Sequence, residues 1–260
     1  MNRIIVSMTS YPKRIMYVYE IILNLLNQTL VPDEIHLWLS EEEFVNKEND
    51  LPIKLKDFID NNIIFVHWLK DNFYIHKRHE IFKYTSDDDL IFFFDDDILY
   101  PKNIIEDIVN KSNELNNEKV INYNMFHKHK YVGKHIKYTL LFSNKEKYIM
   151  YCGHSMFPSK LYPKFLLEDS YIQKRTLLSP ISEECWINPW LIWLDIPVIC
   201  MDFHWGKEIA RNVKKTGLCS WYYKRDEDGL SYKDKCLYAV LKEYPFIYEK
   251  YQRLFSYDFS

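Results

Sequence analysis

Three consecutive aspartates, Asp95, Asp96 and Asp97, are the residues whose type and spacing most directly suggest chemistry. They follow the apolar run Leu90–Phe94, whose length and composition are typical of a strand buried on both faces of a parallel sheet. Carboxylates at the C-terminal end of such a strand lie where open α/β sheets bind ligands. Neighbouring carboxylates repel one another unless a cation neutralises them, and oxygen ligands suit Mg²⁺ or Mn²⁺. The sequence therefore predicts a cation site here.

The same acids have a simpler interpretation. An acidic turn before Pro101 also suits the start of the helix that follows, because proline and aspartate both favour a helix N-terminus. A second acidic run, Asp87–Asp89, precedes the strand. It is predicted to lie at the opposite end of the sheet as a solvated turn.

Alternating strands and helices are predicted to position the triplet. The first half contains strands at Arg3–Met8, Glu34–Ser40, Ile63–Trp68 and Leu90–Phe94. A helix begins at Ile15 and is ended by Pro32, and further helices are predicted at 74–84 and from Ile104 onward. Strand, helix and strand at this spacing predict parallel neighbours in one sheet. The polar loop Thr9–Arg14 follows the first strand, where such sheets bind nucleotides. The alternative is that Lys13 and Arg14 simply solvate a loop.

The second half has a less regular pattern. It contains predicted strands at Val120–Met125, Tyr148–Cys152, Ser155–Phe157 and Val198–Phe203, a helix opening at Glu183, and another at Lys233–Leu241. Between them, His127–Lys137 is strongly basic. Such a run is usually a solvated loop, although it would also attract phosphate or an anionic acceptor. The fold expected from both halves is α/β, with a mainly parallel central sheet flanked by helices.

Composition excludes several classes of protein. The chain has 260 residues, 47% of them hydrophobic, and a net charge of −3, so it has ample core material and no charge that would favour nucleic acid as a partner. Its five cysteines are widely spaced, which favours a reducing, cytoplasmic location over a disulfide framework. No segment approaches the roughly 20 apolar residues of a membrane span, and the N-terminal apolar run is too short for a signal peptide.

Several pieces of the sequence together resemble a known enzyme class. They are Ser7–Ile15, Gln28–Leu30 with Pro32–Ile35, the triplet with Ile98–Pro101, and the acidic pair Glu183-Glu184 before Trp186. The chain resembles the nucleotide-sugar glycosyltransferases of the GT-A fold, and more closely bacterial capsule and lipooligosaccharide transferases of the glycosyltransferase-2-like group. The resemblance implies one domain over 1–260, with a nucleotide-binding half (1–110), an acceptor and catalytic half with a mixed sheet (111–206), and a C-terminal extension (207–260).

The resemblance also implies roles for individual residues. The nucleotide donor would be bound by Thr9, Tyr11, Arg14, Asp71, Lys77, Asp95 and Asp96. A Mn²⁺ or Mg²⁺ ion would be held by Asp97 and Asp95, with His204 as a last ligand. Glu184 or Glu183 would be the catalytic base. His204 has an equally simple interpretation as a solvated or core histidine, and the acidic pair as a helix N-terminus favoured by the helix dipole.

The function that follows is a metal-dependent, inverting transfer of a sugar from a nucleoside-diphosphate sugar, with UDP favoured, to a glycan or lipid-linked saccharide. The alternatives are another metal-dependent nucleotide or phosphoester enzyme, such as a nucleotidyltransferase or phosphatase, and a non-catalytic carbohydrate-binding protein. The aromatic, basic tail 221–259 is predicted either to cap the fold or to rest on a membrane surface as a peripheral contact.

Overall fold

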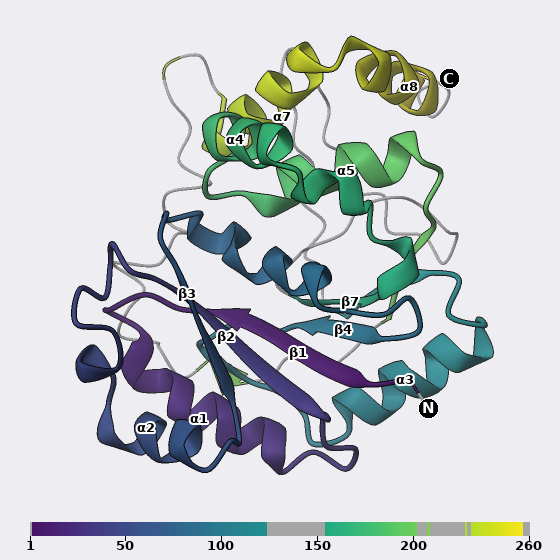
Figure 1. Cartoon of the computed structure of the whole chain (residues 1–260). Helices are drawn as coiled ribbons and strands as arrows, with labels where there is room; N and C mark the ends of the chain where they lie inside the picture. Colours follow the sequence, from purple (N-terminus) through teal and green to yellow (C-terminus); the bar gives the residue numbers. More distant parts are fainter. Residues whose placement is uncertain (1, 124–153, 202–206, 209–226, 228–229, 257–260) are drawn as a thin grey trace.

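A seven-stranded sheet forms the centre of the computed structural model, which describes residues 2–123, 154–201, 207–208, 227 and 230–256. The strand order is β3-β2-β1-β4-β7-β6-β8 (Figure 1). The strands are β1 (Ile4–Thr9), β2 (Glu34–Ser40), β3 (Phe65–Leu69), β4 (Leu90–Phe93), β6 (Val120–Asn122), β7 (Ser155–Pro158) and β8 (Val198–Cys200). A separate antiparallel pair joins β5 (Ile98–Leu99) to β9 (Lys207–Glu208).

The four N-terminal strands of the sheet are all parallel, and the second half of the sheet is mixed. β1 pairs in parallel with β2 and β4, and β2 pairs in parallel with β3. β7 lies antiparallel between β4 and β6, whereas β6 and β8 are parallel. The predicted α/β class, with a mainly parallel sheet that becomes mixed in the second half, is confirmed.

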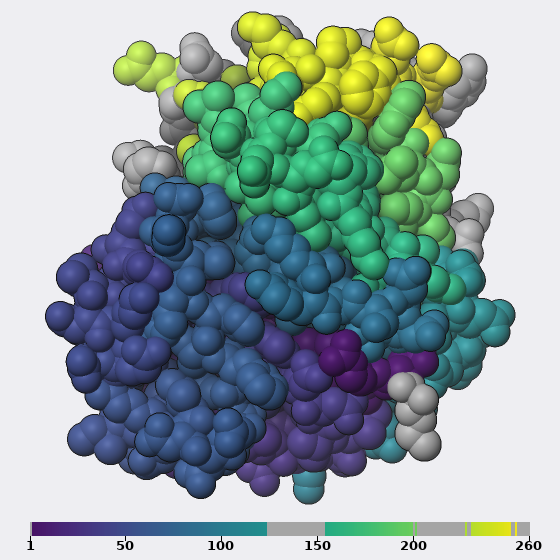
Figure 2. Space-filling view, viewed as in Figure 1, coloured from purple at the N-terminus to yellow at the C-terminus, as the bar shows by residue number. Residues whose placement is uncertain are grey.

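Helices cover both faces of the sheet. One face carries α1 (Ile15–Leu26), α2 (Ile53–Asp60) and α3 (Ile104–Glu114), and the other carries the 3₁₀ segment η2 (Tyr74–Lys83) with α4 (Asp169–Leu178), α5 (Glu183–Trp193), α7 (Tyr232–Glu243) and α8 (Pro245–Ser256) (Figure 1). Short 3₁₀ turns lie at Lys47–Asp50, Ser159–Leu161 and Lys164–Leu167. In Figure 2 the green segments of 154–201 lie between the N-terminal half and the yellow C-terminal helices.

The strand before the aspartates is buried on both faces, as its composition predicts. Leu90, Phe92 and Phe94 pack with the helices of one face, whereas Ile91 and Phe93 pack with those of the other. Successive side chains of a strand point to opposite faces, so a strand covered on both sides must be apolar throughout. This explains why the run is continuous rather than alternating.

Two local predictions differ from the structure, and one helix was missed. The segment 74–84 is a 3₁₀ helix, and all residues from His76 to Phe82 are buried, so it has no solvent-facing stripe. Asp89 is wrongly predicted as solvated: it is buried and accepts hydrogen bonds from Arg3 Nε (3.1 Å) and Nη2 (2.6 Å). The helix α8 was not predicted.

The predicted strand Tyr148–Cys152 and the basic run His127–Lys137 lie outside the described residues.

The helices of the described ranges are too short or too polar to cross a membrane.

Candidate active site

The aspartate triplet lies at the carboxyl end of β4, beside the loop that leaves β1. β4 ends at Phe93, Phe94 is fully buried, and the triplet leads directly into β5. Because β1 and β4 are adjacent and parallel, the loop Ser10–Arg14 and the triplet start from the same edge of the sheet. The topology therefore brings together two segments about 85 positions apart in the sequence.

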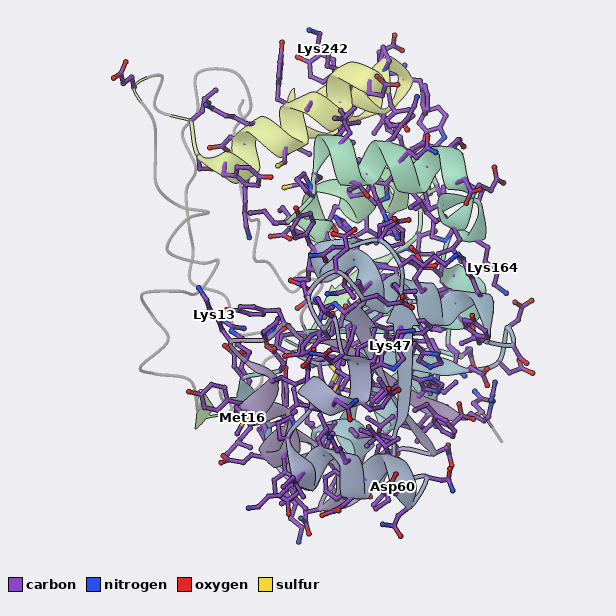
Figure 3. The ribbon with its side chains drawn as sticks, turned by 60° about the vertical axis from the view of Figure 1, so that its left-hand side comes forward. Lys13, Met16, Lys47, Asp60, Lys164 and Lys242 are labelled. Atoms are coloured by element: carbon purple, nitrogen blue, oxygen red, sulfur yellow. The ribbon has the colours of Figure 1, made fainter. Side chains whose placement is uncertain are left out.

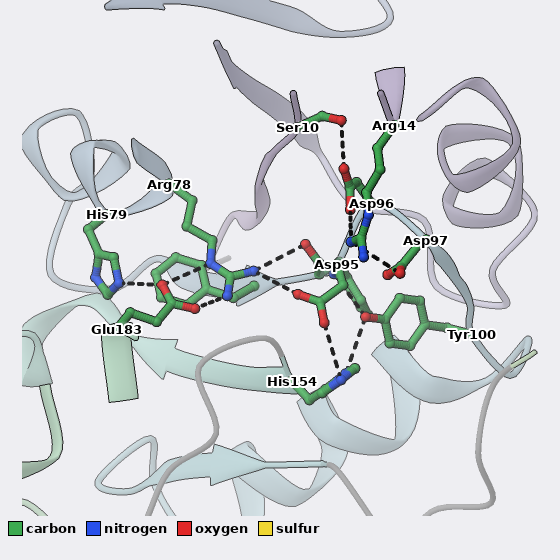
Figure 4. A network of polar contacts seen from close by, with 12 residues as sticks. Ser10, Arg14, Arg78, His79, Asp95, Asp96, Asp97, Tyr100, His154 and Glu183 are labelled. Carbon is green, nitrogen blue, oxygen red and sulfur yellow. Dashed lines mark hydrogen bonds and ion pairs between the residues drawn. The ribbon is translucent and has the colours of Figure 1, made fainter. Parts of the chain in front are cut away.

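The central carboxylate, Asp96, is buried and fully engaged by the β1 loop. Ser10 Oγ donates a hydrogen bond to Asp96 Oδ2 at 2.6 Å, and Arg14 Nη1 donates to Asp96 Oδ1 at 3.0 Å (Figure 4). Burial raises the pKa of Asp96 above its usual range, against the opposing influence of Arg14 and Ser10. This side chain therefore ties the triplet to the β1 loop.

Arg14 also reaches the third carboxylate. The same Nη1 atom lies 3.1 Å from Asp97 Oδ2, so one guanidinium nitrogen bridges two consecutive aspartates. Burial opposes the charged form of Arg14, but Asp96 and Asp97 outweigh it and raise the pKa of the guanidinium. The ring of Tyr11 lies 5.7 Å from Arg14 Cζ, which adds a cation–π contact.

Asp95 faces a second arginine and a histidine. Its Oδ1 lies 3.1 Å from Arg78 Nη1, and its Oδ2 lies 3.4 Å from His154 Nε2. The backbone N–H of Asp95 donates to the hydroxyl of Tyr100 at 2.9 Å. Burial lowers the pKa of His154 although Asp95 favours its charged form. With a side chain 29% exposed, Asp95 is the most accessible of the three acids.

Arg78 connects the triplet to the acidic N-terminus of α5. Its Nε and Nη2 atoms donate to the two carboxylate oxygens of Glu183, the first at 3.1 Å. His79 Nε2 lies 2.8 Å from the same carboxylate, and burial lowers the pKa of His79 well below its usual value. A neutral His79 donates through Nε2. Glu183 is thus a buried acceptor that fixes Arg78, which in turn contacts Asp95 (Figure 4).

Glu184 has a different environment from its neighbour. It forms an ion pair with Lys233 at the start of α7, and its side chain is 12% exposed. The two predicted bases therefore lie side by side on α5, with Glu183 held from the sheet side and Glu184 from the C-terminal helices.

The other predicted residues lie at the same edge of the sheet. Thr9 Oγ1 donates to the carbonyl of Trp38 at 2.8 Å, and Asp71 lies exposed after β3. Lys77 is buried, pairs with Glu43 at 2.8 Å, and has a pKa lowered by burial. His204 lies outside the described residues, so its predicted role stays a prediction.

The donor set suits a hard cation that takes further ligands from a substrate. The Asp95 side chain is 29% exposed, whereas Asp97 and Asp96 are both buried and contact Arg14. Across the described ranges, no group of three or more His, Cys, Asp or Glu side chains is arranged to hold a metal ion. Mg²⁺ is commonly bound by one or two carboxylates plus substrate phosphates, and that is the arrangement these residues fit.

Sequence reasoning missed the residues that organise the site. Arg78, His79, His154, Tyr100 and Lys233 were given no role, although each contacts a predicted site residue. One signal was available: residues 76–79 are four consecutive basic or histidine residues, in the segment that follows the third predicted strand. Ionisable residues in a buried segment are rare unless they are paired.

Comparisons with known proteins concern the fold. No protein-family model matches the chain, and no curated protein matches it. The structure of 2-C-methyl-D-erythritol 4-phosphate cytidylyltransferase (IspD) from Francisella tularensis matches with a TM-score of 0.50 and 14% identity, covering 83% of this chain and 98% of that one. TarS residues 1–349 from S. aureus match with a TM-score of 0.47 and 13% identity, covering 98% and 73%.

The same TarS fragment in complex with UDP-GlcNAc matches with a TM-score of 0.42 and 12% identity, covering 93% of this chain and 72% of that one. At such identities the likenesses concern architecture. This chain has an α/β, Rossmann-like fold, and it shares that architecture with the Francisella cytidylyltransferase.

Proposed function

We propose that the chain is a glycosyltransferase that uses a nucleoside-diphosphate sugar, with UDP favoured, and inverts the anomeric centre. The observation that carries this proposal is the position of the Asp95–Asp97 triplet. It lies at the carboxyl edge of the sheet, where open α/β folds bind nucleotides, between Arg14 and Arg78. Arg78 also connects it to the acidic start of α5.

The arrangement suits the departure of a diphosphate. A nucleoside diphosphate leaves readily only when its developing negative charge is stabilised, and preorganised cationic groups provide that stabilisation. Arg14, which lies at this edge, would be one such group, and Asp95 and Asp97 would hold Mn²⁺ or Mg²⁺. When bound, such an ion would neutralise phosphate oxygens. Asp96 holds the loop that carries Arg14.

Glu184 is the proposed base. Glu183 is buried and engaged by Arg78 and His79, so it positions Arg78 and has no accessible oxygen for an acceptor. Glu184 would accept the proton of the acceptor hydroxyl while that oxygen bonds to the anomeric carbon of the sugar. The bond from the anomeric carbon to the diphosphate breaks in the same step, and the nucleoside diphosphate leaves. The acceptor that we propose is a glycan or a lipid-linked saccharide, by resemblance.

A nucleotidyltransferase is the second candidate. The fold is shared with a cytidylyltransferase at a TM-score of 0.50, and such an enzyme would also bring a nucleotide phosphate to this edge. The two enzymes differ in the bond that breaks. In a nucleotidyltransferase, an acceptor phosphate attacks the α-phosphorus of a nucleoside triphosphate and pyrophosphate leaves. In a glycosyltransferase, the bond from the anomeric carbon breaks and a nucleoside diphosphate leaves.

The deciding experiment follows the released product. The purified chain would be incubated with Mn²⁺ and a panel of UDP- and GDP-activated sugars, and in parallel with nucleoside triphosphates plus sugar or polyol phosphates. The proposal predicts slow release of a nucleoside diphosphate from at least one activated sugar, and loss of that release in Asp97→Asn. The exposed Asp88→Asn is the matched control and should behave as wild type. If the activated sugars stay intact and pyrophosphate is released from the nucleoside triphosphates, the chain is instead a nucleotidyltransferase.

A further inference from the structure

We propose that Arg14 is the built-in counter-ion of the aspartate triplet, that a divalent cation must displace it from Asp97, and that Arg14 thereby couples cation binding to diphosphate binding. This rests on the proposed role of the triplet as a cation site, but not on sugar transfer.

Arg14 bridges two carboxylates of the triplet, Asp96 and Asp97. A single atom, Nη1, lies 3.0 Å from Asp96 Oδ1 and 3.1 Å from Asp97 Oδ2. A divalent cation on Asp97 would therefore lie next to a guanidinium that is always charged. Like charges at such short separation repel strongly when they are partly shielded from water. The two cations compete for the same carboxylate.

The two contacts of Arg14 are unequal. Asp96 is buried and is also held by Ser10 at 2.6 Å, so its position is fixed by two partners from the β1 loop. Asp97 has a side chain that is 11% exposed and starts the turn into β5. Because Ser10 fixes Asp96 within the β1 loop, Asp96 keeps the arginine near the site when an incoming cation takes Asp97.

The second arginine of the site lacks this freedom. Arg78 is 1% exposed, and Glu183 holds it through two of its nitrogens. It also donates to the carbonyl of Phe94 and packs against the ring of Phe93. Moving Arg78 would leave a buried carboxylate uncompensated, which is costly. Arg14 is the arginine that can exchange partners.

Arg14 also has unused hydrogen-bonding capacity. Its Nε atom is buried and has no hydrogen-bond partner among the described residues, although buried donors are normally satisfied. Its neighbours Lys13 and Met16 point outward from the molecule (Figure 3), whereas Arg14 points toward the triplet (Figure 4). A diphosphate oxygen at this edge would satisfy the guanidinium once it leaves Asp97. Arg14 would then favour cation and diphosphate binding together over either alone.

The test is Mn²⁺ binding without any sugar. Titration calorimetry would measure Mn²⁺ alone, and then Mn²⁺ with saturating UDP, for wild type, Arg14→Met and Arg14→Lys. Removing the competing charge should tighten the binding of Mn²⁺ alone by about tenfold, a typical size for coupling between sites. The increase in Mn²⁺ affinity that UDP causes should shrink in the same variant. Arg14→Lys keeps the charge and should stay close to wild type.

Equal or weaker binding of Mn²⁺ by folded Arg14→Met, or no binding by either protein, would overturn the proposal. A melting curve without Mn²⁺ establishes whether each variant is folded. If Arg14→Met does not fold, a crystal structure of the wild-type protein with Mn²⁺ alone decides. The expected result is Mn²⁺ on Asp97 with Arg14 displaced from it. Mn²⁺ on Asp97 with Arg14 still bridging both aspartates, or no Mn²⁺ there, would contradict it. Failure to transfer sugar leaves this outcome unaffected, so the two proposals fail independently.

Discussion

Glu183 and Glu184 are adjacent, have the same chemistry, and are placed for different tasks. Glu183 accepts from Arg78 and His79 in a buried network, so its charge is used to hold the site together. Glu184 is also buried, but 12% of its side chain is exposed, and it pairs with Lys233. The proposed mechanism depends on this division between a positioning carboxylate and a base.

The division predicts opposite behaviour of two matched variants. Glu184→Gln should lower the transfer rate by at least about 10²-fold, the usual contribution of a general base, with a smaller loss of stability than Glu183→Gln, because the Lys233 partner that it leaves is less buried than Arg78. Glu183→Gln should lower the free energy of unfolding by about 3–5 kcal/mol, because it leaves Arg78 buried without its partner. Steady-state rates and urea denaturation of both variants test this. Full activity in Glu184→Gln, or an undiminished stability in Glu183→Gln, would contradict the assignment.

At the scale of elements, β2 and β3 carry a row of stacked rings on the face opposite α1. His36 Nδ1 lies 2.8 Å from His67 Nε2, His36 Nε2 lies 2.9 Å from Glu34, and Trp38 stacks on His67 with ring centroids 3.9 Å apart. Burial lowers the pKa of His67 to about 4, with His36 adding to the effect. Burial also lowers the pKa of His36 although Glu34 favours its charged form.

These shifts predict that acid destabilises the sheet. A histidine whose pKa is lower in the folded than in the unfolded state takes up protons on unfolding, so stability falls as the pH drops below about 6.5 and continues to fall toward the folded-state pKa. His67 alone should contribute about 1 kcal/mol of loss between pH 7 and 5, after discounting for its partial exposure.

The measurement is the free energy of unfolding as a function of pH for wild type and His67→Gln. The glutamine variant should show a shallower decline between pH 7 and 5, because it lacks the titrating group. Identical slopes for the two proteins would show that His67 does not carry the effect.

An element was predictable where its bounds depend on the spacing of nearby apolar residues, and unpredictable where they depend on contacts distant in the sequence. β2 has the predicted bounds, Glu34–Ser40, because its apolar spacing reflects a buried core. α1 begins at the predicted Ile15, but it ends at Leu26, before the Pro32 that was expected to end it. The 3₁₀ segment η2 and the burial of Asp89 were not predictable in this way. Several of their ionisable residues are stabilised by partners far away in the sequence, such as Arg3, 86 positions from Asp89, and Glu183, 105 positions from Arg78.

The candidate site shows the same limit. The mainly parallel sheet that the pattern predicts puts the triplet and the β1 loop at the same edge, but the β1–β4 pairing that brings them together was not predicted. Nor could the burial of Asp96 and Asp97 be predicted, because the three aspartates are identical in type and differ only in what surrounds them. Ser10 and Arg14 decide it for Asp96, and Arg78 and His154 for Asp95.

At the scale of the whole molecule, the C-terminal helices share a core with the sheet. Ile247 of α8 is fully buried in the same cluster as Ile5 of β1 and Phe93 of β4. Glu184 and Lys233 add a polar link between α5 and α7. We therefore predict that the chain unfolds in one cooperative transition.

Two adjacent residues of α8 test this. Ile247→Ala should lower the melting temperature of the single transition, at a cost of about 2–5 kcal/mol for a buried isoleucine. Phe246→Ala, at a side chain that is 41% exposed, should cost less than Ile247→Ala. Calorimetry of both variants would show it. A separate low-temperature transition confined to the Ile247→Ala variant would mean that the C-terminal helices form an independent unit.

The central claim is that the aspartate edge of the sheet binds the diphosphate of a nucleotide-sugar donor. A crystal structure with Mn²⁺ and whichever nucleoside diphosphate stabilises the protein most in melting experiments tests it directly. We expect phosphate oxygens beside Asp95 and Asp97, within reach of Arg14, and the sugar-proximal phosphate toward Glu184. A nucleotide bound elsewhere on the molecule, with the three aspartates facing only water and their arginines, would contradict it.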